Sequence, residues 1–151
     1  MTSDLEVSLG FLEFPEAHTC DGGNLSPQIS LEGLDAGAVA IMVFNPSMRK
    51  GYSYSPWIIW DLPAKTVIPA GIPEGKVVTR PLPAVQGQND AGHIGYAGPC
   101  PPPGGTHRYL FRVYGLDGLI GLSGGSTKYE LTAAIHGHVV QYGETEAVCS
   151  R

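Results

Sequence analysis

Short apolar runs separated by turn residues recur along the whole chain. They are rich in β-branched and aromatic side chains and are too short for most helices, which is the pattern of strands. We predict strands at 5–11, 38–44, 57–62, 76–80 and 108–116. The runs AVAIMVF (38–44) and WIIW (57–60) are continuously apolar, so we expect these two strands to be buried on both faces. The pattern predicts a mainly β architecture.

A single segment carries a helical signal. Ser126 or Thr127 can cap the stretch KYELTAAIHGHVVQYG (128–143), and Glu130, three residues after Thr127, completes a capping-box pattern. Gly137 lies inside this stretch and predicts either its end or a kink. We expect one last short strand, EAVCS, at 146–150.

Composition and charge limit the classes of protein that fit this pattern. A chain of 151 residues, 42% hydrophobic and 15% charged, is expected to fold as one domain spanning residues 1–151. Its 21 glycines and 13 prolines lie between the apolar runs and mark many turns. The formal net charge of −5 lacks the basic footprint of nucleic-acid binding. The acidic start and the lack of a long apolar run predict no signal peptide and no transmembrane segment, so we expect a cytoplasmic protein.

The cysteines and paired histidines do not form a recognisable framework. Cys20, Cys100 and Cys149 are widely separated, odd in number and without Cys-x-x-Cys spacing, which argues against a disulfide scaffold and a structural zinc site. His136 and His138 are interpreted as surface or packing residues. We therefore predict no metal and no cofactor.

The segment GYAGPCPPPGGTHRY (95–109) concentrates the candidate chemistry. Its four prolines lack an N–H group, which excludes a continuous phosphate nest of backbone donors and makes the loop a stiff wall with donors at its edges. If His107 opens a strand, alternation places His107 and Tyr109 on one face beside this wall. Two other interpretations stay open. One is a half-buried histidine beside a core tyrosine, and the other is a thiol hydrolase in which His107 activates Cys100.

The run FNPSMRKGYSYSPW (44–57) follows a predicted buried strand. Its Arg49, Lys50, Tyr52 and Tyr54 interleave basic and aromatic side chains, which suits the rim of a binding pocket. A long solvated turn fits the same residues equally well.

Taken in chain order, these segments resemble the phosphatidylethanolamine-binding protein family, in particular its bacterial and archaeal Raf-kinase-inhibitor-like branch. The resemblance is carried by HTCDGGNLSPQIS (18–30), the strand and Asn-Pro turn at 39–46, WIIWDLPA (57–64), GQNDAGHIGYAGPCPPPGGTHRYLFRVYGLD (87–117) and AIHGHVV (134–140). It implies a β-sandwich of two antiparallel sheets with one or two short helices, and a small anion pocket at one end. It also implies ligand-gated binding to proteins rather than turnover of a substrate.

On this resemblance, two parts of the chain meet in a ligand site. The expected site residues are Asn45, Ser47, Tyr96, Gly98, Pro99, Cys100, Pro101, His107 and Tyr109. We expect Asn45, His107 and Tyr109 to donate hydrogen bonds to the ligand, and Cys100 to offer its backbone N–H.

One of these two parts departs from the family's usual residues. Where the family has Asp-Pro-Asp and then a histidine, this chain has Asn45, Ser47 and Pro56, so two carboxylates and one imidazole are missing. An amide can donate where a carboxylate only accepts, and an amine would lose its carboxylate partner. The change favours a small anionic or polar ligand.

We therefore expect a binding protein without enzymatic activity that takes a phosphate-like group and regulates a protein partner such as a protease or kinase. One alternative is the hydrolase that uses Cys100 and His107. The other is an interaction or dimerisation protein with a vestigial pocket, whose exposed surface would include Tyr52, Tyr54 and Trp57.

Overall fold

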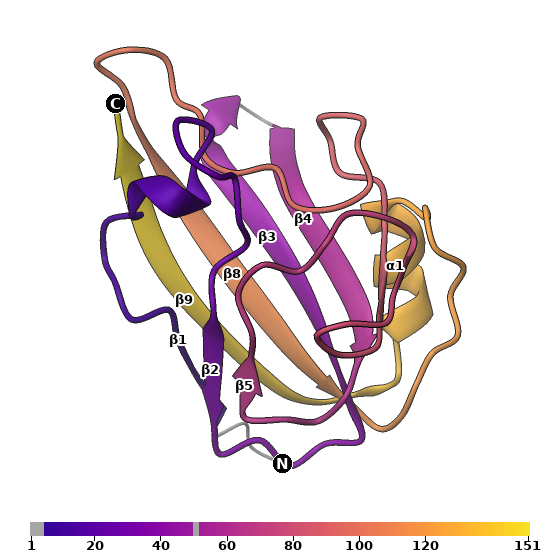
Figure 1. The fold of residues 1–151 in the computed structure, drawn as a ribbon. Helices are drawn as coiled ribbons and strands as arrows, with labels where there is room; N and C mark the ends of the chain where they lie inside the picture. Colours follow the sequence, from indigo (N-terminus) through magenta and orange to yellow (C-terminus); the bar gives the residue numbers. More distant parts are fainter. Residues whose placement is uncertain (1–4, 50–51) are drawn as a thin grey trace.

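Two antiparallel sheets form the body of the protein in a computed structural model, which describes residues 5–49 and 52–151 (Figure 1). The smaller sheet has the strand order β1-β2-β5 and the larger has the order β6-β7-β4-β3-β8-β9. In chain order the strands are β1 Glu6–Ser8, β2 Ile29–Glu32, β3 Ala38–Arg49, β4 Tyr52–Leu62, β5 Val67–Ile68, β6 Val77–Val78, β7 Ala84–Gln86, β8 Thr106–Leu116 and β9 Val139–Ser150. The predicted mainly β fold of two antiparallel sheets is confirmed.

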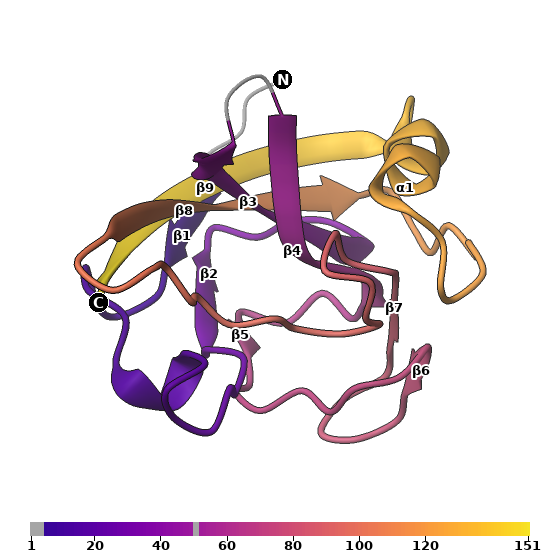
Figure 2. The same cartoon turned by 90° about the horizontal axis from the view of Figure 1, so that it is seen from above.

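The hydrophobic core has two parts, one on each face of the larger sheet. Between the sheets, buried side chains of β2 and β5 pack against Ile41, Trp57 and Phe111 of the larger sheet. On the opposite face, Leu131 of helix α1 (Lys128–Ile135) belongs to a second cluster of side chains from β3, β4 and β8. Figure 2 shows the smaller sheet and α1 apart from one another, with strands of the larger sheet between them. β3 and β4 are therefore buried on both faces, as their continuous apolar runs predict.

Strand β8 shows the alternation expected of a sheet with one buried face. Tyr109, Phe111 and Val113 are buried, whereas the side chains between them are partly exposed or exposed. On the outer face Arg108 and Arg112 make surface ion pairs with carboxylates of β9. His107 therefore lies on the inner face, at the point where the core ends.

The predicted helix is present but shorter than its apolar pattern suggested. The Thr127 side chain accepts from the Glu130 N–H while the Glu130 side chain accepts from the Thr127 N–H, so the predicted capping box is confirmed. The helix ends at Ile135, and Gly137 follows it with a φ of 85°, in the left-handed region that glycine adopts most readily. Of the two roles predicted for Gly137, the end of the helix is confirmed, and the residues beyond it form the first half of β9. At eight residues α1 is too short to cross a bilayer, and no other helix of the described residues is long and apolar enough to do so.

The segment 44–57 is mostly strand rather than a long turn. β3 continues to Arg49 and β4 starts at Tyr52, so the two strands form one long hairpin. The register shifts by a bulge between Val43 and Asn45, which pairs Asn45 with Tyr54. One alternative predicted an exposed surface that includes Tyr52, Tyr54 and Trp57. Trp57 is fully buried, so this prediction is wrong for Trp57. Lys50 lies outside the described residues, and so do the side chains of Arg49 and Tyr52.

The chain before β2 lies along the outer edge of β9. The Phe14 N–H donates to the Val148 carbonyl, and the Val148 N–H donates to the Leu12 carbonyl. Phe14 packs edge-on against Tyr109, with ring centroids 5.4 Å apart. The segment then forms the short helix η1 (Glu16–His18), which Figure 1 places at the end of β9 where the chain terminates.

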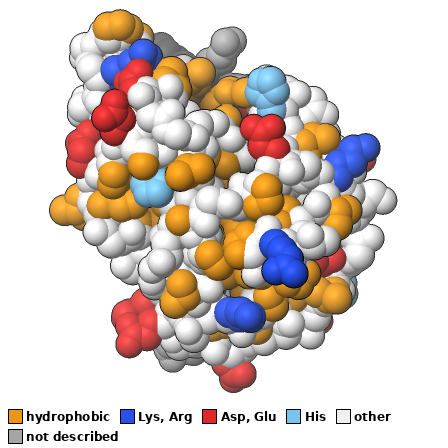
Figure 3. Space-filling view, viewed as in Figure 1, with side chains coloured by type: hydrophobic (Ala, Val, Ile, Leu, Met, Phe, Trp, Pro, Cys, Tyr) orange, Lys and Arg blue, Asp and Glu red, His pale blue; other side chains and the backbone are white. Residues whose placement is uncertain are grey.

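A disulfide joins Cys20, just after η1, to Cys100 in the proline-rich loop, with Cα atoms 5.4 Å apart. The expectation that the cysteines would stay unpaired is therefore wrong for these two, and only Cys149 is free. Arg151 lies over the bridge. Its guanidinium donates to the Pro101 carbonyl and pairs with the Asp21 carboxylate at 3.1 Å. Around the C-terminus, at the upper left of Figure 3, a basic side chain touches acidic ones on the surface.

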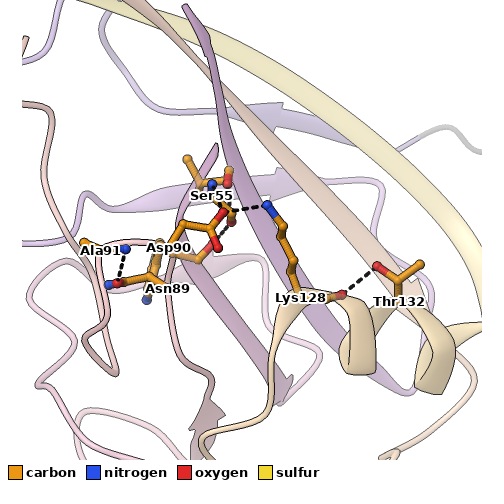
Figure 4. Close-up of polar contacts among 8 residues, drawn as sticks. Ser55, Asn89, Asp90, Ala91, Lys128 and Thr132 are labelled. Carbon is orange, nitrogen blue, oxygen red and sulfur yellow. Dashed lines mark hydrogen bonds and ion pairs between the residues drawn. The ribbon is translucent and has the colours of Figure 1, made fainter. Parts of the chain in front are cut away.

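A mostly buried ion pair ties α1 to the start of β4 (Figure 4). The Lys128 Nζ lies 2.5 Å from the Asp90 Oδ2, and the two side chains are 7% and 18% exposed. The same carboxylate accepts from the Ser55 N–H, and the Asp90 N–H donates to the Ser55 carbonyl. Asp90 is therefore hydrogen-bonded to both the backbone N–H and the backbone carbonyl of Ser55.

Loss of the Cys20–Cys100 disulfide should lower the free energy of unfolding by about 2 to 4 kcal/mol, because the bridge restrains an unfolded loop of 80 residues. Urea unfolding with and without dithiothreitol measures this difference. The Cys20→Ser/Cys100→Ser variant is the control, since the reductant should not change its midpoint. Equal midpoints for the oxidised and reduced protein would contradict the prediction.

Replacement of Lys128 by methionine should cost about 3 kcal/mol, because it leaves the partly buried Asp90 carboxylate without its cation. Lys76→Met is the matched control, since Lys76 is exposed and makes no described ion pair. Adding Asp90→Asn to Lys128→Met should recover part of the loss. Thermal unfolding of the four proteins measures these changes in stability. If Lys128 had a purely steric role, adding Asp90→Asn would recover none of the lost stability.

Candidate functional site

A small cavity opens at the end of the larger sheet where β3 ends and β4 and β8 begin. Its volume is about 60 Å³. It is lined by Asn45, Met48, Tyr54, Pro56, Ala97, Gly98, Cys100, His107 and Tyr109. Three strands and the loop that precedes β8 each supply part of this lining.

Asn45 holds the imidazole of His107 in a defined orientation. The Ser47 N–H donates to the Asn45 Oδ1 at 3.0 Å, which assigns the amide so that its Nδ2 faces His107. Nδ2 lies 3.2 Å from the Nδ1 of His107 and donates to it. In the neutral ring the hydrogen is then on Nε2. Since Asn45 is almost fully buried, water does not compete strongly for this amide.

Tyr109 lines the cavity and is almost fully buried. Burial, the main cause, raises the pKa of Tyr109, so its phenol stays protonated at neutral pH. The backbone N–H of Cys100 donates to this oxygen and opposes part of that rise. With an acceptor position of the oxygen taken by Cys100, the hydroxyl hydrogen is directed elsewhere. The rings of His107 and Tyr109 have centroids 6.5 Å apart.

The wall formed by residues 96–101 rests on the segment that follows η1. The Gly98 N–H donates to the Asn24 side chain at 2.7 Å, and the Cys20 N–H donates to the Pro99 carbonyl at 3.1 Å. A Cβ at Gly98 would lie 2.5 Å from the His18 carbonyl oxygen, so only glycine fits there. The N–H groups of Gly98 and Cys100, expected as donors at the edges of the wall, bind protein atoms rather than face a ligand.

Four of the residues expected in the site support the cavity without lining it. The Ser47 hydroxyl accepts from the Arg108 N–H, which ties the end of β3 to β8. Tyr96 is buried against the edge of Trp57, and its hydroxyl donates to the His18 carbonyl. Pro99 and Pro101 accept hydrogen bonds from Cys20 and Arg151 through their carbonyls.

Four lining residues are absent from the expected set of site residues, namely Met48, Tyr54, Pro56 and Ala97. Tyr54 was noted only as a rim residue, and it lies opposite Asn45 because β4 has one extra residue between Trp57 and Tyr54. Ala97 lies opposite Pro56, since its N–H donates to the Pro56 carbonyl at 3.0 Å. The pairing of Ala97 with Pro56 joins segments far apart in sequence, so no local pattern signals it.

The described lining holds no formally charged side chain, since it contains neither Asp, Glu, Lys nor Arg. Its polar groups are the side chains of Asn45, Tyr54, His107 and Tyr109. Within the described part of the chain, the Nε2 of His107 has no protein partner, so this donor is left for a ligand or water. In the same residues no group of three or more His, Cys, Asp or Glu side chains converges to hold a metal ion.

Cys100 cannot serve as the thiol nucleophile of the hydrolase alternative, because its sulfur is bonded to Cys20. That alternative is therefore wrong for the oxidised protein. The free thiol belongs to Cys149, which lies opposite His107 in the register of β8 and β9 and is buried. Burial is the main cause that raises the pKa of Cys149, helped by the nearby Glu13 and Asp21 carboxylates, so it is a thiol rather than a reactive thiolate.

Comparison with known proteins places the chain and its fold in a family. The model of the phosphatidylethanolamine-binding protein family matches residues 8–150. The UPF0098 protein PH1269 of Pyrococcus horikoshii is 42% identical over 140 residues, which cover 91% of this chain and 70% of that protein. Among solved structures, Escherichia coli YbcL has a TM-score of 0.85 at 25% identity, and CT736 of Chlamydia trachomatis has 0.83 at 27%. Each alignment covers 99% of both chains. The chain therefore belongs to the phosphatidylethanolamine-binding protein family.

Proposed function

We propose that this protein is a non-enzymatic binding protein whose cavity captures a small anionic group such as phosphate. The observation that carries the proposal is the hydrogen bond from Asn45 to the Nδ1 of His107. It leaves Nε2–H as the free polar group of the ring. In the neutral ring this group is a hydrogen-bond donor and not an acceptor.

The size of the cavity fits a small group. A volume of about 60 Å³ is enough for several water molecules, since one needs roughly 10 to 15 Å³. Pockets for drug-sized molecules are about 300 to 1,000 Å³. The cavity therefore suits a head group or a free anion, and any larger part of a ligand would extend beyond it.

The polar lining favours a ligand that accepts hydrogen bonds. His107 offers Nε2–H, and Tyr109 offers the hydrogen of a phenol whose oxygen already accepts from Cys100. No carboxylate lines the described cavity, so nothing there repels an anion. Hydrogen bonds to a charged acceptor are worth about 1.5 to 3 kcal/mol each, so two such donors can hold an anion without a cation.

The departures from the family's usual residues point to the same ligand class. Asn45 and Ser47 stand where the family has carboxylates, so an ammonium group such as that of ethanolamine finds no opposite charge here. Asn45 instead donates from its amide to His107 and orients that ring.

Regulation of a protein partner is the second part of the proposal. Met48 at the edge of the cavity is 46% exposed, so a bound ligand would lie next to surface that another protein can contact. A ligand that touches both proteins changes their affinity for one another. A protease or kinase is the class of partner that the family resemblance suggests.

Inorganic phosphate should stabilise the folded protein and His107→Ala should abolish this effect. At ten times its dissociation constant, phosphate should raise the free energy of unfolding by about 1.4 kcal/mol, read from thermal melts at constant ionic strength. His136→Ala is the matched control, because His136 is exposed and does not line the cavity. Equal shifts in the wild type and in His107→Ala would place the anion elsewhere, and no shift in the wild type would remove the main support for the proposal.

Asn45→Asp should reverse the hydrogen bond to His107 and weaken phosphate binding at pH 9 by at least about tenfold. A carboxylate only accepts, so the hydrogen of the neutral ring moves to Nδ1 and Nε2 turns a lone pair toward the anion. Nitrogen NMR of the His107 side chain reports the tautomer, and titration calorimetry reports the affinity. Gln28→Glu makes the same change of charge at an exposed position and should leave both unchanged. An unaltered tautomer in Asn45→Asp would show that Asn45 does not orient the ring.

A further inference from the structure

The Cys20–Cys100 disulfide is part of the cavity wall rather than a remote cross-link. Cys100 lines the cavity, and its backbone N–H donates to the hydroxyl of Tyr109. The same residue is bonded through its sulfur to Cys20, in the segment on which the wall rests. Any change at this bridge therefore acts directly on a residue that contacts the ligand space.

Few backbone hydrogen bonds hold this wall in place without the bridge. The prolines at 99, 101, 102 and 103 have no N–H to give. Between the wall and η1 with the segment after it, the hydrogen bonds of the described residues include Gly98 N–H to Asn24, Asn24 Nδ2 to the Tyr96 carbonyl, Cys20 N–H to Pro99 and the Tyr96 hydroxyl to His18. The disulfide is the covalent link among them. Residues 99–101 thus depend on it more than the core strands do.

The bridge is accessible and is chemically poised for reduction. Both Cys20 and Cys100 are exposed. The guanidinium of Arg151 lies 3.3 Å from the Cys100 sulfur, where it can stabilise a thiolate on that residue. A stabilised thiolate is the better leaving group in thiol–disulfide exchange. This favours attack on Cys20 and departure of Cys100.

The reductant has to come from outside the protein. The remaining cysteine, Cys149, is buried, and burial raises the pKa of its thiol, so it is a poor nucleophile at neutral pH. Arg151 also pairs with Asp21, beside Cys20, and donates to the Pro101 carbonyl, beside Cys100. These contacts keep the two cysteines near one another after the bond is broken, which allows it to form again.

We propose that the Cys20–Cys100 disulfide is a redox latch on the anion cavity, closed when oxidised and released by a dithiol. The thiolate of the dithiol attacks the Cys20 sulfur, the S–S bond breaks, and Cys100 leaves as a thiolate beside Arg151. The second thiol of the reductant then displaces Cys20 and completes a cyclic disulfide of its own. The protein gains two electrons and two protons, and the dithiol loses them. Release of Cys100 frees Tyr109 from its N–H and loosens the wall, so the cavity binds its anion more weakly.

The ligand side of this latch rests on the proposed function, whereas the opening of the wall does not. The test therefore measures both on the full chain. Inorganic phosphate is titrated calorimetrically into the oxidised protein, the protein reduced with dithiothreitol, and the Cys20→Ser/Cys100→Ser variant. Hydrogen exchange of the Cys100 amide is followed in the same samples, with the Trp57 amide in the buried core as the internal reference for an intact fold.

Reduction should weaken phosphate binding by about tenfold, as expected for the loss of one oriented hydrogen-bond donor. Exchange of the Cys100 amide should accelerate while that of Trp57 stays the same, and reoxidation should restore both values. The serine variant should behave as the reduced protein and ignore dithiothreitol. Arg151→Gln should slow reduction about threefold, as expected for a leaving thiol that is less stabilised, whereas Arg112→Gln on the outer face of β8 should not.

Two results would overturn the latch. One is equal phosphate affinity in the oxidised and reduced protein with the Trp57 amide still protected. The other is equal exchange of the Cys100 amide in both states. If phosphate binds neither state, the anion proposal fails, and the exchange rates alone then decide whether the wall opens on reduction.

Discussion

Strands β3 and β4 are covered on both faces, and the place of each element around the cavity follows from that constraint. The smaller sheet has to lie on one side and α1 on the other for Ile41, Ile58 and their neighbours to leave water. β8 pairs with β3 from Ala38 to Phe44, which brings its first residues beside Asn45. The cavity then forms where these strands leave the core and side chains can be polar.

The groups that can bind a ligand in the cavity are those whose hydrogen-bond donors are not already bonded within the protein. The N–H groups of the proline-rich wall are engaged by Asn24 and Tyr109, so recognition falls to side chains of the strands. The amide of Asn45 is shared between the Ser47 N–H and His107. The described lining has no acidic side chain, and hydrogen bonds between neutral groups hold Asn45 and His107 in place.

Local patterns in the sequence predicted much of this arrangement. The alternation from His107 to Val113 gave the inner face of β8 correctly, and the Thr127 and Glu130 pair marked the start of α1, because both depend only on neighbouring residues. The same local reasoning left open whether Gly137 ends α1 or kinks it, and the choice depends on the apolar residues beyond it, which pair in the larger sheet.

Features that arise from tertiary contacts were not predictable in the same way. The bulge near Asn45 changes the register by one residue and brings Tyr54 into the lining, and a single-residue shift leaves no trace in apolar periodicity. The pairing of Cys20 with Cys100 joins residues 80 apart, so their wide spacing was uninformative until η1 was seen to lie against the wall. The contact of Pro56 with Ala97 is of the same kind.

The chain segment along β9 also bears on association between molecules. β9 has 12 residues and is the last strand of the larger sheet, and an open edge of that length would offer a template for another chain. Leu12 and Phe14 occupy the backbone groups of Val148, and the Glu13 carboxylate accepts from the Ser150 N–H. At the opposite edge β6 has only two residues, too few to recruit a strand. The C-terminal end of β9 and the short edge strand β6 are thus protected against edge-to-edge aggregation.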